Sequence, residues 1–113
     1  MILPQTEWLP PKEFPDLRQA EEIAIDLETR DPDLKKLGSG VMRNNGEVVG
    51  IAVAVDGYKG YFPIAHGEGP NMNRDKVLSW FKDVCASPAT KIFHNAMYDV
   101  CWIRKLGIKI NGL

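Results

Sequence analysis

The stretch Ile23–Glu28, which reads Ile-Ala-Ile-Asp-Leu-Glu, decides the fold because its side chains alternate with a period of two. Large aliphatic side chains at positions 23, 25 and 27 point to one face of an extended chain. Ala24, Asp26 and Glu28 point to the other face. The pattern therefore predicts a β-strand over residues 21–28 with one apolar face.

Two further apolar stretches supply partners for this strand. Residues 47–55 form a nearly continuous apolar run, which is typical of a strand buried on both faces. Asp56-Gly57 is a hairpin turn signal, and residues 59–65 follow as the return strand. Pro63 indicates a sheet edge or a strand end, because proline cannot donate to a hydrogen-bond ladder. Together these stretches predict a meander of three antiparallel strands.

The second half of the chain alternates between helical and extended patterns. Apolar residues at helical spacing predict a helix over residues 74–86. A short strand at 90–94, a second helix at 96–106 and the start of a strand at 108–110 follow. The element order β-β-β-α-β-α-β predicts an α/β protein with a mixed sheet and helices packed on it.

The segments outside these elements are rich in proline and glycine. Residues 1–20 hold four of the eight prolines, which predicts an extended leader that Trp8 and Phe14 pin to the body. Residues 29–46 are predicted to be a long polar connection. The expected domain covers residues 21–113.

Composition narrows the class of protein. A chain of 113 residues with 44% hydrophobic and 26% charged residues fits one small globular domain. The net charge of −1 is unlike that of a general nucleic-acid coat, so any contact with nucleic acid is expected to be local. No apolar run is long enough for a membrane span and no signal peptide is visible. Cys85 and Cys101 are expected to be reduced core residues, and a cytoplasmic location is expected.

Asp26 and Glu28 carry the first functional signal. Two carboxylates at i and i+2 share one face of a strand, roughly 6–7 Å apart by strand rise, and repel each other. A divalent cation between them relieves that repulsion, and Mg²⁺ prefers carboxylate oxygen. Because the strand is otherwise apolar, we expect their face to be shielded from water. The alternative is a half-exposed edge strand with ordinary surface acids.

Asp99 adds a third carboxylate. It lies one turn into the second helix, directly after a strand end, where ligand sites of α/β sheets gather. From there it can face the first strand. The alternative is a carboxylate that matches the positive end of the helix dipole.

Two sequence stretches resemble a known superfamily. Residues 23–29, Ile-Ala-Ile-Asp-Leu-Glu-Thr, resemble the first motif of the DEDD exonucleases, and residues 94–99, His-Asn-Ala-Met-Tyr-Asp, resemble the second. Residues 102–108 also resemble the segment that follows in family-A DNA polymerases. The resemblance implies an RNase H-like fold and a two-metal 3′–5′ exonuclease, the proofreading part of a phage-like or bacterial polymerase.

The resemblance also implies roles for individual residues. Asp26 would bridge two Mg²⁺ or Mn²⁺ ions. Glu28 would ligate one of them and orient the attacking water, and Asp99 would hold the second. Thr29 would lie beside the terminal nucleotide, and Asn95 and Tyr98 would support the site or contact the substrate. Asn95 has the alternative of a purely local helix cap.

The third motif of the superfamily, Tyr-x-x-x-Asp or His-x-x-x-Asp, does not occur in these 113 residues. We therefore expect a partial domain that binds divalent metal weakly and has little nuclease activity alone. The expected partners are a single-stranded DNA 3′ end and the remainder of a polymerase chain. The alternatives are an inactive remnant that binds nucleic acid or a partner protein, and an exoribonuclease of the same superfamily.

Overall fold

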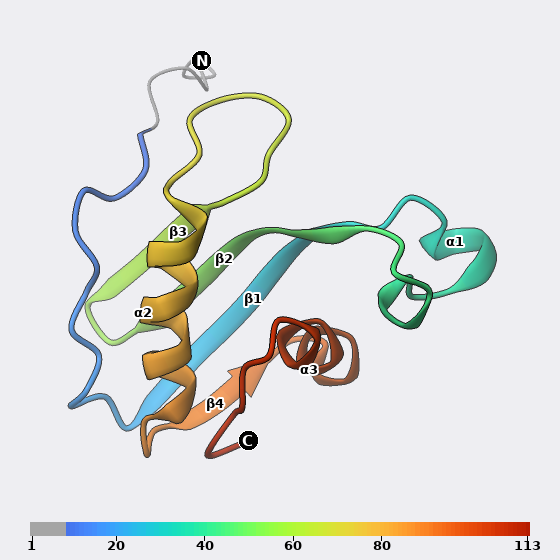
Figure 1. Ribbon diagram of the computed structural model, residues 1–113. Helices are drawn as coiled ribbons and strands as arrows, with labels where there is room; N and C mark the ends of the chain where they lie inside the picture. Colours follow the sequence, from blue (N-terminus) through green and yellow to red (C-terminus); the bar gives the residue numbers. More distant parts are fainter. Residues whose placement is uncertain (1–8) are drawn as a thin grey trace, which may run out of the picture.

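The computed structural model describes residues 9–113 and shows a mixed α/β domain (Figure 1). Four strands form one sheet in the order β3-β2-β1-β4. Strand β1 pairs antiparallel with β2 and parallel with β4, and β2 pairs antiparallel with β3. The strands are β1 (Glu22–Arg30), β2 (Glu47–Val55), β3 (Tyr58–Pro63) and β4 (Thr90–Phe93). The predicted meander followed by β-α alternation is confirmed, and the arrangement is compatible with a truncated RNase H-like fold.

Two longer helices follow the meander. In the chain, helix α2 (Arg74–Ala86) lies between β3 and β4, and α3 (Ala96–Lys105) follows β4. Helix α2 crosses the sheet (Figure 1). Helix α2 begins where the Asn73 side chain accepts a hydrogen bond from the Lys76 amide at 3.0 Å. Both predicted helices are therefore confirmed to within a residue.

The alternation of β1 is also confirmed. Its residues at 23, 25 and 27 are buried in one core with apolar side chains of both long helices. The opposite face of the sheet is open along the described chain. In strand β2, residues 48–51 and Val53 are buried. Ala52 and Ala54, which face the open side of the sheet, are only half-buried. The prediction that 47–55 is buried on both faces is wrong for its second half.

The segment before β1 packs against α2, which confirms the prediction that Phe14 pins this segment to the body. The Phe14 ring stacks on Trp80 at 5.3 Å, and the Trp80 indole donates to the Pro15 carbonyl at 3.1 Å. Trp8, the other predicted anchor, lies outside the described residues.

The predicted loop 29–46 is more ordered than expected. Strand β1 continues to Arg30, and the loop contains helix α1 (Leu34–Leu37) and the 3₁₀ turn η2 (Val41–Arg43). These turns form a lobe that projects from the end of β1 (Figure 1). The Asp31 carboxylate anchors it by accepting from the Gly40 amide at 3.0 and 3.1 Å.

The strand predicted at 108–110 is wrong. Residues 107–113 form no strand; two separate backbone bonds tie them to the body instead, from Asn111 to the Cys85 carbonyl and from Lys91 to the Gly112 carbonyl. Gly112, two residues beyond the predicted strand, has φ 72°, a left-handed conformation that does not belong to an extended strand.

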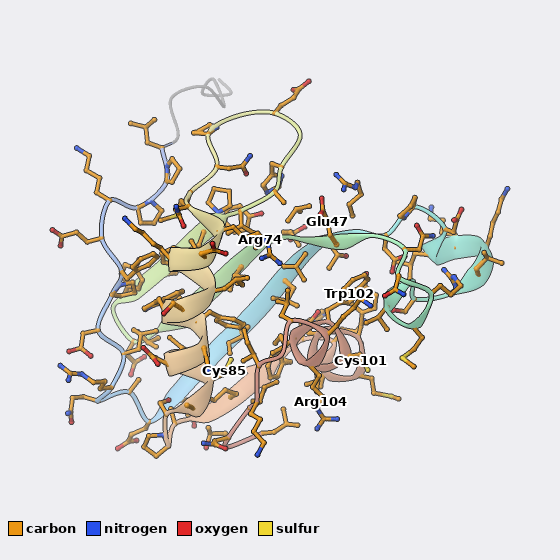
Figure 2. The ribbon with its side chains drawn as sticks, in the orientation of Figure 1. Glu47, Arg74, Cys85, Cys101, Trp102 and Arg104 are labelled. Carbon is orange, nitrogen blue, oxygen red and sulfur yellow. The ribbon has the colours of Figure 1, made fainter. Side chains whose placement is uncertain are left out.

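The two cysteines lie on different helices (Figure 2) and are free. Cys85 is buried under α2, and burial raises the pKa of its thiol to about 12. Cys101 is exposed, so its prediction as a core residue is wrong. Val100 and Ile103 turn towards the core, and the 100° step per residue leaves Cys101 on the outer side. No helix in residues 9–113 has both the length and the apolar character that crossing a bilayer requires.

Candidate functional site

Asp26 and Glu28 lie on the open face of the sheet. Asp26 is the cross-strand partner of Ala52, and Glu28 is that of Gly50. Both carboxylates are exposed, so the expectation that their face is shielded from water is wrong for the described chain. The pairing register shifts between Glu28 and Thr29. Such irregularities re-aim side chains beside functional sites.

Asp99 is different, because its side chain is 2% exposed. Its Oδ2 atom has no hydrogen-bond partner in the described chain. Burial, with smaller contributions in the same direction from the negative charges of Asp26 and Glu28, raises the pKa of this carboxyl to about 6, while His94 acts to lower it. The chain therefore brings all three predicted carboxylates into one electrostatic neighbourhood at the junction of β1 and α3.

Thr29 and Tyr98 contact each other across this junction. Their hydroxyls are 2.6 Å apart, and the Tyr98 hydroxyl donates to Asp31 at 3.0 Å. Since the single Tyr98 proton goes to Asp31, Thr29 is the donor in the first bond. Burial is the main cause that raises the pKa of Tyr98. The two predicted substrate residues are thus tied together beside Asp99, and Asp31 completes the group.

Asn95 takes the position before α3. Its side chain makes no capping hydrogen bond, so the predicted side-chain cap is wrong. Its carbonyl accepts from the Asp99 amide at 3.0 Å, as at any helix start. The Asn95 side chain is exposed and is available to a ligand.

The side chains as they stand do not form a finished metal centre. Across residues 9–113, no three His, Cys, Asp or Glu side chains are grouped closely enough to hold a metal ion. The donor set nevertheless suits a hard divalent cation, because it consists of carboxylate oxygens with one buried, unpartnered oxygen on Asp99. Asp26 and Glu28 are both exposed on the open face of the sheet.

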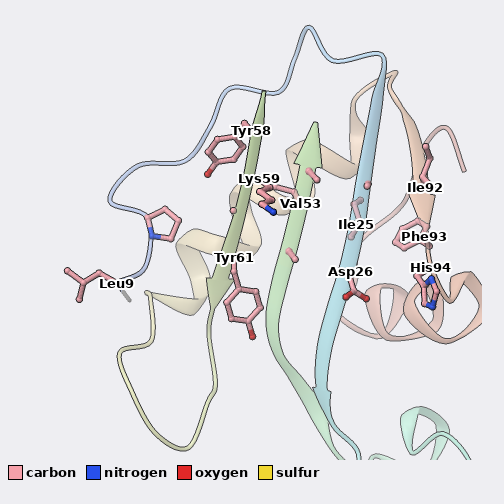
Figure 3. Close-up of a pocket in the computed structure, with 15 residues that line it drawn as sticks. Leu9, Ile25, Asp26, Val53, Tyr58, Lys59, Tyr61, Ile92, Phe93 and His94 are labelled. Carbon is pink, nitrogen blue, oxygen red and sulfur yellow. The ribbon is translucent and has the colours of Figure 1, made fainter. Parts of the chain in front are cut away.

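Sequence reasoning missed two aromatic neighbours of the carboxylates. In the close-up, Asp26 on β1 lies between Tyr61 on β3 and His94 after β4 (Figure 3). These residues and several alanines line a groove along the open sheet face. The pairing of Ala52 with Tyr61 follows from the Asp56-Gly57 turn. The register of this hairpin could therefore have predicted that Tyr61 lies on the same sheet face as Asp26.

The fold and site define an α/β protein in which two exposed carboxylates of the first strand, Asp26 and Glu28, act electrostatically on the buried Asp99 of α3. The sequence matches no protein-family model. It is similar to a protein of Pseudomonas phage M6 described as a DNA-directed DNA polymerase, with 42% identity over 81 residues. The alignment covers 68% of this chain and 12% of the phage protein, so the chain spans a small part of that relative's length. This similarity links the chain to DNA polymerases.

Proposed function

We propose that this chain is part of the 3′–5′ exonuclease domain of a DNA polymerase, with Asp26, Glu28 and Asp99 as ligands for two divalent metal ions. The polymerase link comes from the phage relative. The observation that carries the exonuclease proposal is the buried Asp99 carboxyl, whose pKa is raised to about 6 by burial and by Asp26 and Glu28. A cation among these groups offsets the repulsion that opposes ionisation of Asp99.

The proposed chemistry is phosphodiester hydrolysis at a 3′ end. Mg²⁺ or Mn²⁺, when bound, supplies a hydroxide near neutral pH and stabilises the leaving oxygen. Asp26 would lie between the two ion positions, Glu28 would hold one ion and the attacking water, and Asp99 the other. Thr29 and Tyr98, held together at 2.6 Å, would form one wall for the terminal nucleotide.

The proposed substrate is single-stranded DNA, and the proposed partner is the remainder of a polymerase chain. Asn95, which is exposed at the start of α3, would contact the substrate. We expect little trimming of a labelled oligonucleotide by the 113 residues alone with Mg²⁺. Rapid trimming that Asp26→Ala abolishes would contradict the view that this site is partial, and preferential trimming of RNA would favour an exoribonuclease.

Metal binding tests the proposal directly. Electron paramagnetic resonance of free Mn²⁺ should show a weak site, with a Kd on the order of 10⁻⁴–10⁻³ M, as for loosely built divalent-cation sites. Asp26→Ala and Asp99→Asn should each weaken it by about tenfold or more. Asp56→Asn, in the exposed turn between β2 and β3, is the matched control and should change nothing. Equal affinity in all four proteins would contradict the proposed site.

A further inference from the structure

Tyr61 has an unusual position on the open sheet face. It pairs with Ala52, but its ring leans one row along the sheet and covers Gly50. A Cβ atom on Gly50 would lie 1.8 Å from the Tyr61 hydroxyl and 2.2 Å from Cζ. The glycine therefore makes room for the phenol, since any larger residue would displace it.

Gly50 is also the cross-strand partner of Glu28. A hydroxyl above Gly50 is consequently beside the Glu28 side chain on the same face of the sheet. The electrostatics agree with this placement. Burial raises the pKa of Tyr61 to about 12, and the charge of Glu28 acts in the same direction. The phenol thus stays protonated at neutral pH and offers a hydroxyl next to the carboxylate.

His66 holds the other side of the phenol. The Tyr61 hydroxyl is hydrogen-bonded to His66 Nε2, and the two rings meet edge to face at 5.7 Å. His66 itself is fixed by Asn71, which accepts from the His66 amide and donates to the His66 carbonyl, both at 2.9 Å. The loop that carries the imidazole closes where the Met72 amide donates to the Pro63 carbonyl at 2.8 Å. The phenol therefore rests on a fixed support.

We propose that Tyr61 and His66 form a positioning pair that restricts the side chain of Glu28 at the carboxylate site. Glu28 is exposed and has three rotatable bonds, so a neighbouring wall reduces the number of its conformations. His66 acts through Tyr61, and neither residue is needed as a metal ligand. The proposed consequence for metal binding rests on the proposed function, whereas the effect on Glu28 does not.

The first test needs no metal. The side-chain carboxyl of Glu28 is followed by ¹³C NMR in a chain labelled at glutamate, with Glu28→Gln to assign its signal. Tyr61→Phe and His66→Ala should move the Glu28 signal in the same direction, and His66→Gln, which keeps a hydrogen-bonding group, should restore part of the shift. Tyr58→Phe removes a hydroxyl from the opposite face of the same strand and should leave the signal in place.

A Glu28 signal that is unchanged in both Tyr61→Phe and His66→Ala would overturn the pair. The second test is the Mn²⁺ titration, in which each variant should bind about tenfold more weakly, the low end for outer-shell substitutions. The double variant should be no weaker than either single one. Unaltered Mn²⁺ affinity in Tyr61→Phe would overturn the role in supporting a ligand. Absence of Mn²⁺ binding in the unchanged chain would instead count against the proposed function, and the Glu28 signal still decides the pair.

Discussion

Asp99 is the residue whose environment most constrains function. Its carboxyl is almost fully buried, one oxygen has no hydrogen-bond partner among residues 9–113, and two like charges act on it. A structural acid at a helix start would be exposed to water and would gain from the helix dipole. Burial without a partner costs stability instead. A site of this kind is typical of a functional group whose partner is a ligand.

The first prediction concerns the pH dependence of stability at Asp99. Its pKa is about 6 in the folded chain against an ordinary value of 3.8, so the folded state binds more protons between these values. Stability contributed by the protonated form is therefore lost as pH rises from about 4 to 6.5. In urea unfolding, the free energy of unfolding of Asp99→Asn should rise relative to that of the unchanged chain across this pH range. Above the range the difference between the two should stay constant. A difference that does not vary with pH would contradict the buried, charge-coupled carboxyl.

The second prediction concerns Gly50. A methyl group there collides with the Tyr61 ring, so Gly50→Ala should lower the free energy of unfolding by about 1–3 kcal/mol. Tyr61→Ala removes the collision, and the two changes together should cost less than their sum. Chemical denaturation of both single variants and the double variant measures the coupling. Simple additivity would show that the ring does not lie over Gly50.

At the scale of elements, Asp31 joins three parts of the chain. Its carboxylate accepts from the Gly40 amide in the lobe and from Tyr98 on α3, and it follows directly after β1. Bonds of this type to a charged group are worth more than bonds between neutral groups. The Asp31 side chain therefore couples the lobe over residues 31–46 to α3 and Tyr98, beside a second bond from Lys105 to Asn44.

Asp31→Ala should consequently destabilise the chain by about 1–3 kcal/mol and open the lobe. Hydrogen exchange should accelerate at the Gly40 amide, with little change in α2. Asp33→Ala is the control, because Asp33 accepts a single side-chain bond, from Asn45 at 2.8 Å. Equal exchange at Gly40 in both variants would contradict the anchoring role of Asp31.

The elements themselves followed from local patterns. The period-two pattern around Ile25 predicted β1 and its buried face, and helical spacing predicted α2 to the residue. The failed strand at 108–110 has apolar residues in the right alternation. Whether such a stretch joins a sheet depends on a neighbouring strand with unpaired backbone groups, and within residues 9–113 only Lys91 of β4 donates to this segment, at the Gly112 carbonyl. Pairing across the fold is not encoded locally.

The site was predictable only in part. The motif around Asp26 and Asp99 gave the three carboxylates, and the chain places them around one junction. The support by Tyr61 and His66 was not foreseen, because it depends on the hairpin register and on a missing side chain at Gly50. The exposure of Asp26 was also not foreseen, since it depends on what covers the other face of the sheet.

At the scale of the whole molecule, one sheet face carries the apolar core and the other carries the exposed Asp26 and Glu28. The helices α2 and α3 contribute to a single apolar core on one side of β1. The other side presents Asp26 within an open groove (Figure 3). The similarity to a phage DNA polymerase covers 12% of that protein's length. Two of the three proposed metal ligands, Asp26 and Glu28, lie on the open face of the sheet.

The most direct test of this account is the location of bound metal. Two-dimensional NMR of the ¹⁵N-labelled chain, titrated with traces of Mn²⁺ at pH 7.5, reports which amides lie near the ion. The account predicts that the signals of Asp26, Glu28 and Asp99 broaden first and together, and that Asp26→Ala removes the effect at Asp99. Broadening that is centred on other acidic residues, such as Glu21 and Glu22, with Asp99 unaffected would contradict it.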